Sequence, residues 1–374
     1  MIPVVFSVDH KYIMPLSVAL VSMLETKNSL TNYEIFILLS DDVSQMDVRK
    51  LNEIFLKYKI DHNVHYVSMN DLYSQAYIPS NNSSISKATY YRLNIANILP
   101  IEIGKCIYCD CDVVINCDLS EFYNIDIQDY DVAGVYDEGC KYFNTGKEYH
   151  NDSTYINAGI LLINLETWRS SELTKRMQLR LSEKFLFMDQ DIINIECSGR
   201  KKVLPSTEYI INQPIQIENG EIERIIHFAG LFKPWEMSVD NLYFKLWNKY
   251  ALKAGYGDLV NKNIKDYEII SEKIADRLKK KVILWGARAS IIYIKCFLKL
   301  FDVEVVAVGD NDLNKIGLFY DDILVLGIDD IRKYKDVRFL VTANKKYYKD
   351  IKMQLISNNV KEEDILHIEE VLKV

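Results

Sequence analysis

The sequence predicts an α/β protein: a large domain with a mostly parallel sheet flanked by helices, followed by a smaller α/β domain. Three observations lead to this prediction. The chain has 374 residues, more than one average domain contains. Short apolar runs typical of strands alternate with helical patterns, and the alternation starts again after a charged helical segment near residue 280. Apolar residues make up 49% of the chain, enough for two hydrophobic cores.

Strands and helices alternate along the first part of the chain. We expect strands at 4–8, 34–39 and 64–67, separated by helices at 16–24 and 48–58. A polar segment at 80–86 and a helical pattern from Tyr90 to Ile98 lead to a strand at 105–110. This order is typical of a parallel sheet with helices on both faces.

The pattern continues to the end of the chain. We predict strands at 132–135 and 159–163, an exposed loop at 149–154, helices at 166–186 and from Asp189 onward, and an apolar run at 225–228. A charged helical segment from Leu242 to Lys281 precedes a strand at 281–286, a helix at 291–300 and a strand at 303–308. We therefore expect a first domain at 1–255, a helical linker at 256–280 and a second domain at 281–374.

Composition excludes several classes of protein. The net charge of -8 argues against a nucleic-acid partner, because phosphate backbones attract dense lysine and arginine surfaces. The N-terminal run Met1–Asp9 lacks the positive start and the small-residue cleavage site of a signal peptide. No apolar stretch reaches the roughly 18 to 20 residues that a membrane span needs. We therefore expect a cytoplasmic protein.

The cysteines do not suggest a disulfide framework or a zinc site. They number seven and stand at 106, 109, 111, 117, 140, 197 and 296. An odd count with these spacings does not fit a small secreted domain. The run from Cys106 to Cys111 reads as a strand, whose alternation directs successive side chains to opposite faces and disfavours zinc.

The first candidate site is Asp110-Cys111-Asp112, which follows a predicted buried strand. Side chains two residues apart in extended backbone point the same way, so both carboxylates can share one cation. Similar pairs occur elsewhere by chance, at 129/131, 189/191 and 310/312, but only the first directly ends a long apolar strand. Asp9 ends the first strand, and carboxyl ends of parallel strands meet at the ligand-binding edge of an open sheet.

Three more segments combine polar with small residues. In 157–164, an asparagine and two small residues precede an apolar run and let a substrate approach the backbone, although a simple turn explains them equally well. The acidic start of 189–194 suits the first turn of a helix, for which capping alone would suffice. The segment 227–235 contains an imidazole, a glycine, an ammonium group and an indole, although a lone histidine after an apolar run is more often a core residue.

In their order and separation, these segments resemble family 8 glycosyltransferases, which include bacterial lipopolysaccharide galactosyl- and glucosyltransferases and glycogenin. The resemblance covers about the first two thirds of the chain. It implies a GT-A nucleotide-diphospho-sugar transferase fold, with Ser7, Asp9 and Tyr12 lining the uracil and ribose pocket and Arg92 near the UDP-sugar. Lys11 stands where bacterial galactosyltransferases of this kind often carry asparagine, which leaves the nucleotide contacts there open.

The resemblance also implies a metal site formed by Asp110, Asp112 and His227. Two carboxylates and an imidazole suit Mn²⁺ better than Mg²⁺, which prefers oxygen ligands alone. A metal acting as a Lewis acid, with Lys233 nearby, would stabilise negative charge on the departing diphosphate. Gly230 would let the backbone approach that phosphate.

Four positions match those that hold the donor sugar's hydroxyls and face its anomeric carbon in the family: Asp137, Asn157, Asp189 and Gln190. Asp189 and Gln190 are the candidate catalytic residues. The family retains the anomeric configuration, which either front-face attack or a covalent intermediate can produce. Because an amide is a poor nucleophile, Gln190 favours front-face transfer.

The C-terminal region resembles the Rossmann-like modules attached to sugar-modifying enzymes of bacterial surface polysaccharide pathways. The segment Gly286–Ser290 keeps one glycine of the dinucleotide fingerprint, and Asp310 follows Gly286 by 24 residues, a distance typical of a ribose-binding carboxylate. We favour a docking or assembly module over a working nucleotide site.

The sequence thus predicts a retaining transferase that moves galactose or glucose from a UDP donor to a glycan, glycolipid or glycoprotein acceptor at the inner membrane face. The run Lys279–Lys281 would suit anionic lipid, although a solvated charge run explains it better. Two rivals are a sugar nucleotidyltransferase, disfavoured because Val5–Asp9 lacks the glycine and lysine of a triphosphate loop, and a UDP-sugar sensor or scaffold that binds without turnover. The acceptor, the hexose, the linkage and any homo-oligomer are left open.

Overall fold

The computed structural model describes residues 1–69, 73–79, 86–137, 140, 148–205, 208–212, 222, 224–230, 233–287, 291–320 and 323–372. The chain forms two compact units. The first comprises Met1–Pro214, Asn219–Lys233 and Lys245–Gly257, and the second comprises Ile215–Glu218, Pro234–Phe244 and Asp258–Val374.

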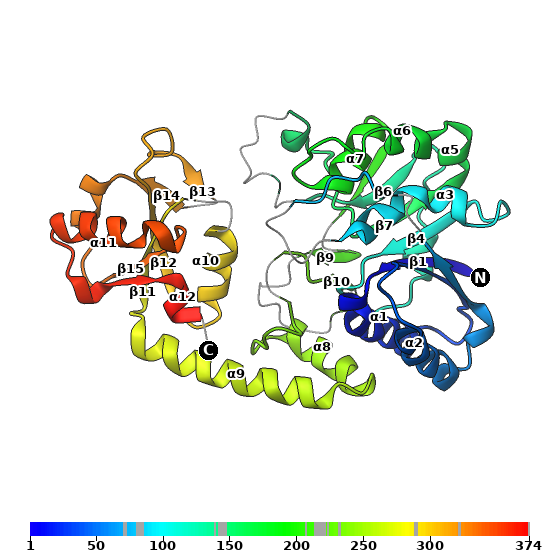
Figure 1. The fold of residues 1–374 in the computed structure, drawn as a ribbon, viewed down its shortest axis with the longest axis horizontal. Helices are drawn as coiled ribbons and strands as arrows, with labels where there is room; N and C mark the ends of the chain where they lie inside the picture. Colours follow the sequence, from blue (N-terminus) through cyan, green and yellow to red (C-terminus); the bar gives the residue numbers. More distant parts are fainter. Residues whose placement is uncertain are drawn as a thin grey trace. The chain divides into compact units, whose positions relative to one another are not determined.

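A seven-stranded sheet of order β3-β2-β1-β4-β7-β6-β8 forms the centre of the first unit (Figure 1). Its strands are β1 Ile2–Val8, β2 Tyr33–Leu39, β3 Val64–Ser68, β4 Lys105–Cys109, β6 Val132–Val135, β7 Ile160–Asn164 and β8 Lys201–Leu204. Strand β7 runs antiparallel to β4 and β6, whereas the other neighbours are parallel. A smaller sheet of order β5-β10-β9 consists of β5 Val113–Ile115, β10 Ile225–His227 and β9 Ile210–Asn212.

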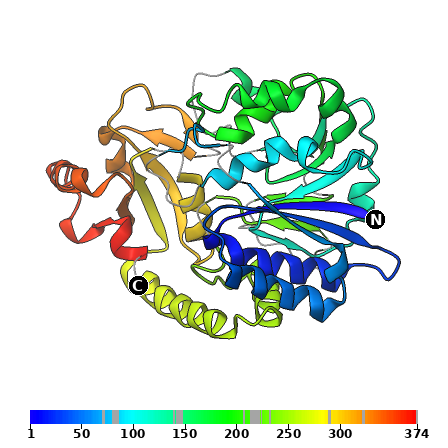
Figure 2. The same ribbon diagram turned by 45° about the vertical axis from the view of Figure 1, so that its right-hand side comes forward.

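Helices cover both faces of the large sheet, α1 and α2 on one and α3, α5, α6 and α7 on the other (Figures 1 and 2). Their bounds are α1 Ile13–Thr26, α2 Gln45–Tyr58, α3 Ile95–Ile98, α5 Leu165–Ser170, α6 Leu173–Gln178 and α7 Met188–Glu196, and a short α4 spans Ser120–Tyr123. Every residue of β1 and β7 is buried, as expected for strands covered on both sides. On the second face, Tyr108, Trp168, Met177 and Ile192 belong to one apolar core.

Local chemistry explains where the helices begin and end. Helix α2 starts with a capping box, in which the Ser44 hydroxyl accepts from the Asp47 amide and the Asp47 carboxylate accepts from the Ser44 amide. It ends at Lys59, whose φ of 57° is left-handed. The predicted helix at 166–186 is instead two short helices, α5 and α6, because Glu172 adopts a φ of 52° between them.

Part of the chain before β4 is wound more tightly than predicted. The expected helix from Tyr90 to Ile98 begins as a 3₁₀ helix, η3 (Lys87–Asn94), and only its end is α3. In the described part of the first unit, further 3₁₀ turns are η1 His10–Tyr12, η2 Asp61–Asn63 and η5 Glu148–Asn151. The last of these includes His150, which is only 1% exposed, so the prediction of an exposed loop at 149–154 is wrong at this residue.

The second unit has its own sheet, of order β13-β14-β12-β11-β15-β16, which is parallel except for the pair β13–β14. Its strands are β11 Lys281–Trp285, β12 Glu304–Gly309, β13 Phe319–Tyr320, β14 Ile323–Leu326, β15 Arg338–Val341 and β16 Ile365–His367. Its helices include α10 Ile291–Lys299, α11 Tyr348–Ser357 and α12 Ile368–Leu372, with 3₁₀ turns at Ile328–Lys333, Lys345–Tyr347 and Glu362–Asp364. The predicted second α/β domain with a parallel sheet is confirmed.

The charged segment from Leu242 to Lys281 forms two helices rather than one. They are α8 Leu242–Lys253 and α9 Gly257–Arg277, and Gly255 between them adopts a φ of 91° that favours glycine. Helix α9 buries Val260, Asn263, Ile270 and Ile274. Among the described residues, no helix combines the length and the apolar character required to traverse a bilayer.

Candidate functional site

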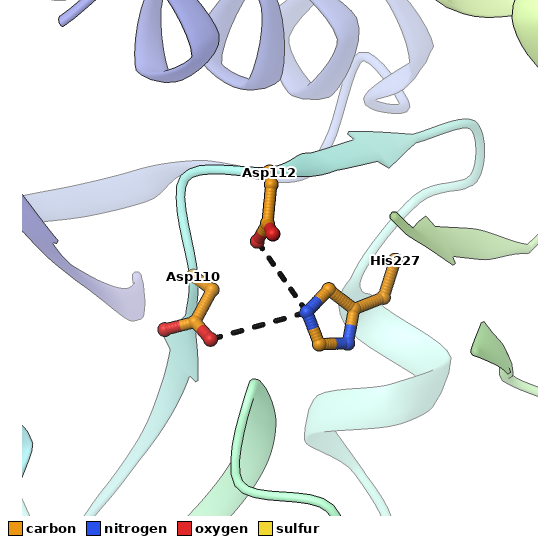
Figure 3. Close-up of side chains that lie close together, drawn as sticks. All are labelled: Asp110, Asp112 and His227. Carbon is orange, nitrogen blue, oxygen red and sulfur yellow. Dashed lines mark ion pairs between the residues drawn. The ribbon is translucent and has the colours of Figure 1, made fainter. Parts of the chain in front are cut away.

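Strand pairing brings two carboxylates and an imidazole together. Asp110 follows β4, Asp112 precedes β5, and His227 is the last residue of β10. Strands β5 and β10 are antiparallel, with His227 opposite Val113, so the imidazole meets the loop between β4 and β5 (Figure 3). One ligand atom from each of Asp110, Asp112 and His227 lies within 4.8 Å of the other two.

Each carboxylate in this cluster has one oxygen paired with a cation and one facing the imidazole. The Nε2 atom of His227 lies 3.4 Å from Asp112 Oδ1 and 3.9 Å from Asp110 Oδ2 (Figure 3). The remaining oxygens accept hydrogen bonds at 2.7 Å from Arg92 and at 2.6 Å from Lys233. The three atoms that face one another are therefore the ones left for a metal ion.

The surroundings of His227 fit the role of a metal ligand. Its Nδ1 lies 2.9 Å from the Asn212 side-chain oxygen, and because this oxygen accepts, Nδ1 carries the proton. The Nε2 lone pair is then directed at the two carboxylates, an arrangement typical of metal-binding histidines. Burial alone would raise the pKa of Asp112, but the ammonium group of Lys233 opposes this effect, and that pKa lies well below its usual value. The carboxylate is thus ready to bind a cation.

A glycine makes room for this imidazole. A Cβ atom placed on Gly159 would lie 2.2 Å from His227 Cε1 and 2.7 Å from His227 Nε2, both too close. His227 is only 4% exposed and has little space to move. A side chain at Gly159 would therefore push the imidazole out of line with the carboxylates.

We expect Gly159→Ala to weaken Mn²⁺ binding about 10-fold to 100-fold, the usual effect of disturbing a residue that orients a ligand. Calorimetric titration with Mn²⁺ alone measures this. Gly257→Ala is the matched control, since the nearest atom to its added Cβ is 3.7 Å away. Equal Mn²⁺ affinities in both variants would show that His227 does not hold the ion.

Arg92 connects the metal cluster to α7. Arg92 is 4% exposed, and its guanidinium pairs with Asp110 at 2.7 Å and with Asp189 at 2.9 Å. It also donates to the carbonyl oxygen of Ala158 and stacks on the Tyr108 ring, with Cζ 4.4 Å from the ring centroid. Arg92 thus neutralises two carboxylates from different parts of the sequence.

The Asp189 carboxylate pairs with Arg92. Its other contact is a 2.5 Å hydrogen bond from the Thr89 hydroxyl, and it is 3% exposed. Burial raises the pKa of Asp189 to about 6, although Arg92 and Thr89 favour the charged form. The structure therefore groups Asp189 with Arg92.

The other three residues expected around the donor sugar lie together. Asp137 Oδ2 accepts hydrogen bonds from Gln190 Nε2 at 2.9 Å and from Asn157 Nδ2 at 3.1 Å. The Asn157 oxygen accepts from the Gly159 amide at 2.9 Å, which joins this group to the wall of the metal cluster.

The residues expected around the nucleotide lie at the end of β1. Asp9 caps η1 by accepting from the Tyr12 amide at 3.1 Å, and Cys111 Sγ lies 3.1 Å from the Ser7 carbonyl oxygen. Burial raises the pKa of Tyr12, and the carboxylates of Asp112, Asp9 and Asp110 raise it further. The Ser7 hydroxyl is buried without a hydrogen-bond partner among the described residues, as expected of a group that awaits a ligand.

Gly230 and Lys233 belong to the segment that follows β10. Gly230 has a φ of 88°, a left-handed conformation that favours glycine. Lys233 donates to the Phe228 carbonyl oxygen at 2.7 Å as well as to Asp112, so its ammonium group lies beside the candidate metal site.

In the second unit, the motif around Gly286 is occupied by contacts of the chain itself. Asp310 accepts from the Ala287 amide at 2.7 Å, from Lys315 Nζ at 3.2 Å and from the Asp312 amide at 2.9 Å. Residues 288–290 of the motif lie outside the described residues. The carboxylate expected to bind ribose is thus already engaged.

Sequence reasoning missed three residues that support the site. Tyr108 donates to Asp110 Oδ1 at 2.8 Å and lies two residues before it on the same strand face, so strand alternation would have identified it. Thr89 and Asn212 carry no comparable signal, because their contacts with Asp189 and His227 depend on tertiary structure.

Comparison with known proteins identifies the class of protein to which this fold and site belong. Residues 3–238 match the family described as Glycosyl transferase family 8. The protein therefore belongs to glycosyltransferase family 8. Residues 278–366 match a second family, described as C2185-like, N-terminal.

Individual curated proteins and solved structures are also similar to this chain. General stress protein A of Bacillus subtilis strain 168 is 28% identical over 262 residues, which cover 64% of this chain and 89% of that protein. A lipopolysaccharide 1,2-glucosyltransferase of Escherichia coli is 26% identical over 312 residues, or 77% of this chain and 89% of that protein. The solved structure of galactosyltransferase LgtC with donor and acceptor sugar analogs has a TM-score of 0.59 at 20% identity, over 67% of this chain and 96% of that chain. The predicted GT-A fold is confirmed.

Proposed function

We propose that this protein is a retaining hexosyltransferase that transfers galactose or glucose from a UDP-sugar to a glycan, glycolipid or glycoprotein acceptor, with Mn²⁺ as its cofactor. The observation that carries the proposal is the convergence of Asp110, Asp112 and His227. A bound ion would supply Lewis-acid stabilisation of the diphosphate leaving group. The relative that is a lipopolysaccharide 1,2-glucosyltransferase supports both the hexose and the type of acceptor.

Other residues of the site bind the nucleotide and the diphosphate. Ser7, Asp9 and Tyr12 bind the uracil and ribose, and the free Ser7 hydroxyl supports this assignment. Lys233 adds positive charge where the diphosphate departs, and Gly230 lets the backbone approach it. Because a fixed positive charge helps most when the leaving group is fully charged, it stabilises the transition state more than the bound donor.

Asp137, Asn157 and Gln190 orient the donor sugar. Their mutual hydrogen bonds support a common role and hold the three side chains in fixed positions. Gln190 is a poor nucleophile, and Asp189 is engaged by Arg92. Both observations favour front-face attack by the acceptor over a covalent intermediate, with Asp189 acting through Arg92.

The C-terminal unit serves, in this proposal, as a Rossmann-like docking or assembly module at 281–374, after a first domain at 1–255 and a helical linker at 256–280. The engaged Asp310 carboxylate supports docking over nucleotide binding. The lysine run at 279–281 gives no support for lipid contact, because Lys279 pairs with Asp336 and Asp364 at 3.2 and 3.1 Å.

The test is release of UDP from a panel of nucleotide sugars, with Mn²⁺ or EDTA, with water as the acceptor and Asp110→Ala as control. Metal-dependent hydrolysis of one UDP-hexose that the substitution abolishes would establish the class and the donor. UDP-sugar binding without hydrolysis, even with added glycan acceptors, would favour the sensor or scaffold. Absence of both binding and hydrolysis would overturn the proposal, and reaction of a nucleoside triphosphate with a sugar phosphate would favour the nucleotidyltransferase.

A further inference from the structure

The orientation of the Gln190 side-chain amide is fixed by its partners. Its oxygen accepts from the Ala158 amide at 3.0 Å, and its nitrogen donates to Asp137 Oδ2 at 2.9 Å and to the Tyr155 hydroxyl at 3.3 Å. A backbone amide donates only and a carboxylate accepts only, so a rotated amide would place like groups against each other. Both N–H groups are used, and one lone pair of the oxygen is left for a ligand.

Tyr155 supplies one of the three groups that hold the Gln190 amide in this orientation. The residue is fully buried, and its hydroxyl donates to Asp191 Oδ1 at 2.5 Å while it accepts from Gln190. Burial raises the pKa of Tyr155 well above its usual value, and Asp191 raises it further, so the hydroxyl keeps its proton. With this proton directed at Asp191, an oxygen lone pair faces the Gln190 amide.

Asp191 is held in place from two further directions. It accepts from His150 Nε2 at 2.7 Å and from the Phe187 amide at 3.0 Å, and its side chain is inaccessible to solvent. The His150 ring packs edge-on against Tyr155 and Phe187, with centroids 5.3 Å away in each case. A continuous chain of hydrogen bonds therefore runs from His150 through Asp191 and Tyr155 to Gln190.

We propose that Tyr155, whose hydroxyl is oriented by Asp191 and His150, is a positioning residue that helps to fix the Gln190 amide, so that its oxygen is the atom presented to the donor sugar. The inference rests on the proposed function for its effect on turnover, but the coupling between Tyr155 and Gln190 exists in the protein alone. In this proposal Asp191 acts only as a buried hydrogen-bond acceptor and forms no covalent bond with the substrate.

Tyr155→Phe tests this role because it removes the hydroxyl and keeps the packed ring. The Gln190 amide then loses one of its two acceptors and is held only by the Ala158 amide and Asp137. We expect kcat for donor hydrolysis to fall about tenfold, the equivalent of one hydrogen bond, while KM for the UDP-sugar changes less than twofold. Tyr90→Phe is the matched control: Tyr90 is equally buried, and its hydroxyl donates to the Tyr77 carbonyl oxygen at 2.6 Å, whereas the Tyr155 hydroxyl accepts from Gln190.

Combination with Gln190→Ala shows whether Tyr155 acts through Gln190. In that background Tyr155→Phe should cause no further loss of kcat, and in urea unfolding the effects of the two substitutions on the midpoint should not add. Equal losses of kcat in the Tyr155 and Tyr90 variants, or additive effects in both assays, would overturn the inference. The unfolding measurement needs no turnover, and calorimetric binding of UDP to the wild type separately tests the proposed function.

Discussion

Asp112→Asn is expected to reduce turnover of the UDP-sugar by on the order of a hundredfold to a thousandfold and to abolish tight Mn²⁺ binding. An amide is a poorer cation ligand than a carboxylate, and the lost Lewis-acid stabilisation is worth several kcal/mol. Asparagine has nearly the same size and can still accept from Lys233, so circular dichroism should show an intact fold. Calorimetry with Mn²⁺ gives a readout that does not depend on activity.

The matched control for this substitution is Asp129→Asn. Asp129 belongs to another pair of carboxylates at the same spacing, but it is exposed and is not a member of the candidate metal cluster. Turnover and Mn²⁺ affinity should stay at wild-type values. Wild-type activity of Asp112→Asn at saturating Mn²⁺ would instead show that the metal site lies elsewhere.

Arg92→Met should lower the free energy of unfolding by about 3–5 kcal/mol, because it leaves Asp110 and the buried Asp189 without their common cation. The loss should depend on pH. The folded-state pKa of Asp189 is about 6, above its ordinary value, so the folded state binds more protons than the unfolded state below pH 6 and gains stability as the pH falls. Without Arg92 this pKa rises further, and the destabilisation should be smaller at pH 5.5 than at pH 8.

Urea unfolding at both pH values measures this difference, with Arg169→Met as control. The Arg169 guanidinium donates only to backbone carbonyl oxygens among its recorded contacts, those of Ala96, Leu99, Pro100, Ile101 and Ile103. The decrease in the free energy of unfolding caused by Arg169→Met should be independent of pH. If Arg92→Met lowers the free energy of unfolding equally at both pH values, protonation of Asp189 is not the cause of the expected pH dependence.

The carboxylate pair was predictable from sequence, whereas its third partner was not. Asp110 and Asp112 directly follow an apolar strand, and an open α/β sheet places such residues at its ligand-binding edge. His227 is 115 residues beyond Asp112 and reaches it only because β10 pairs with the short strand β5. A strand of three residues is too short to give a detectable periodicity in the sequence. Only the family resemblance therefore linked His227 to the two carboxylates.

The residues that hold Gln190 in place were not predicted from the sequence, for a related reason. The segment 149–154 is rich in polar residues and was expected to be exposed, yet His150 is buried. The buried His150 ring forms a hydrogen bond with Asp191, a residue that the sequence analysis placed at the start of a helix. Composition alone cannot distinguish a solvated polar side chain from one whose partner lies 41 residues away.

The separation between Asp112 and His227 also has a kinetic consequence. Closing a loop of this length costs entropy before any contact is gained, and the strands involved have three residues each. The large sheet, by contrast, contains neighbours that are close in the sequence, such as β1 and β2. During refolding, high affinity for Mn²⁺ should therefore return later than the ellipticity of the helices, so that capture of the ion reports completed folding of the first unit.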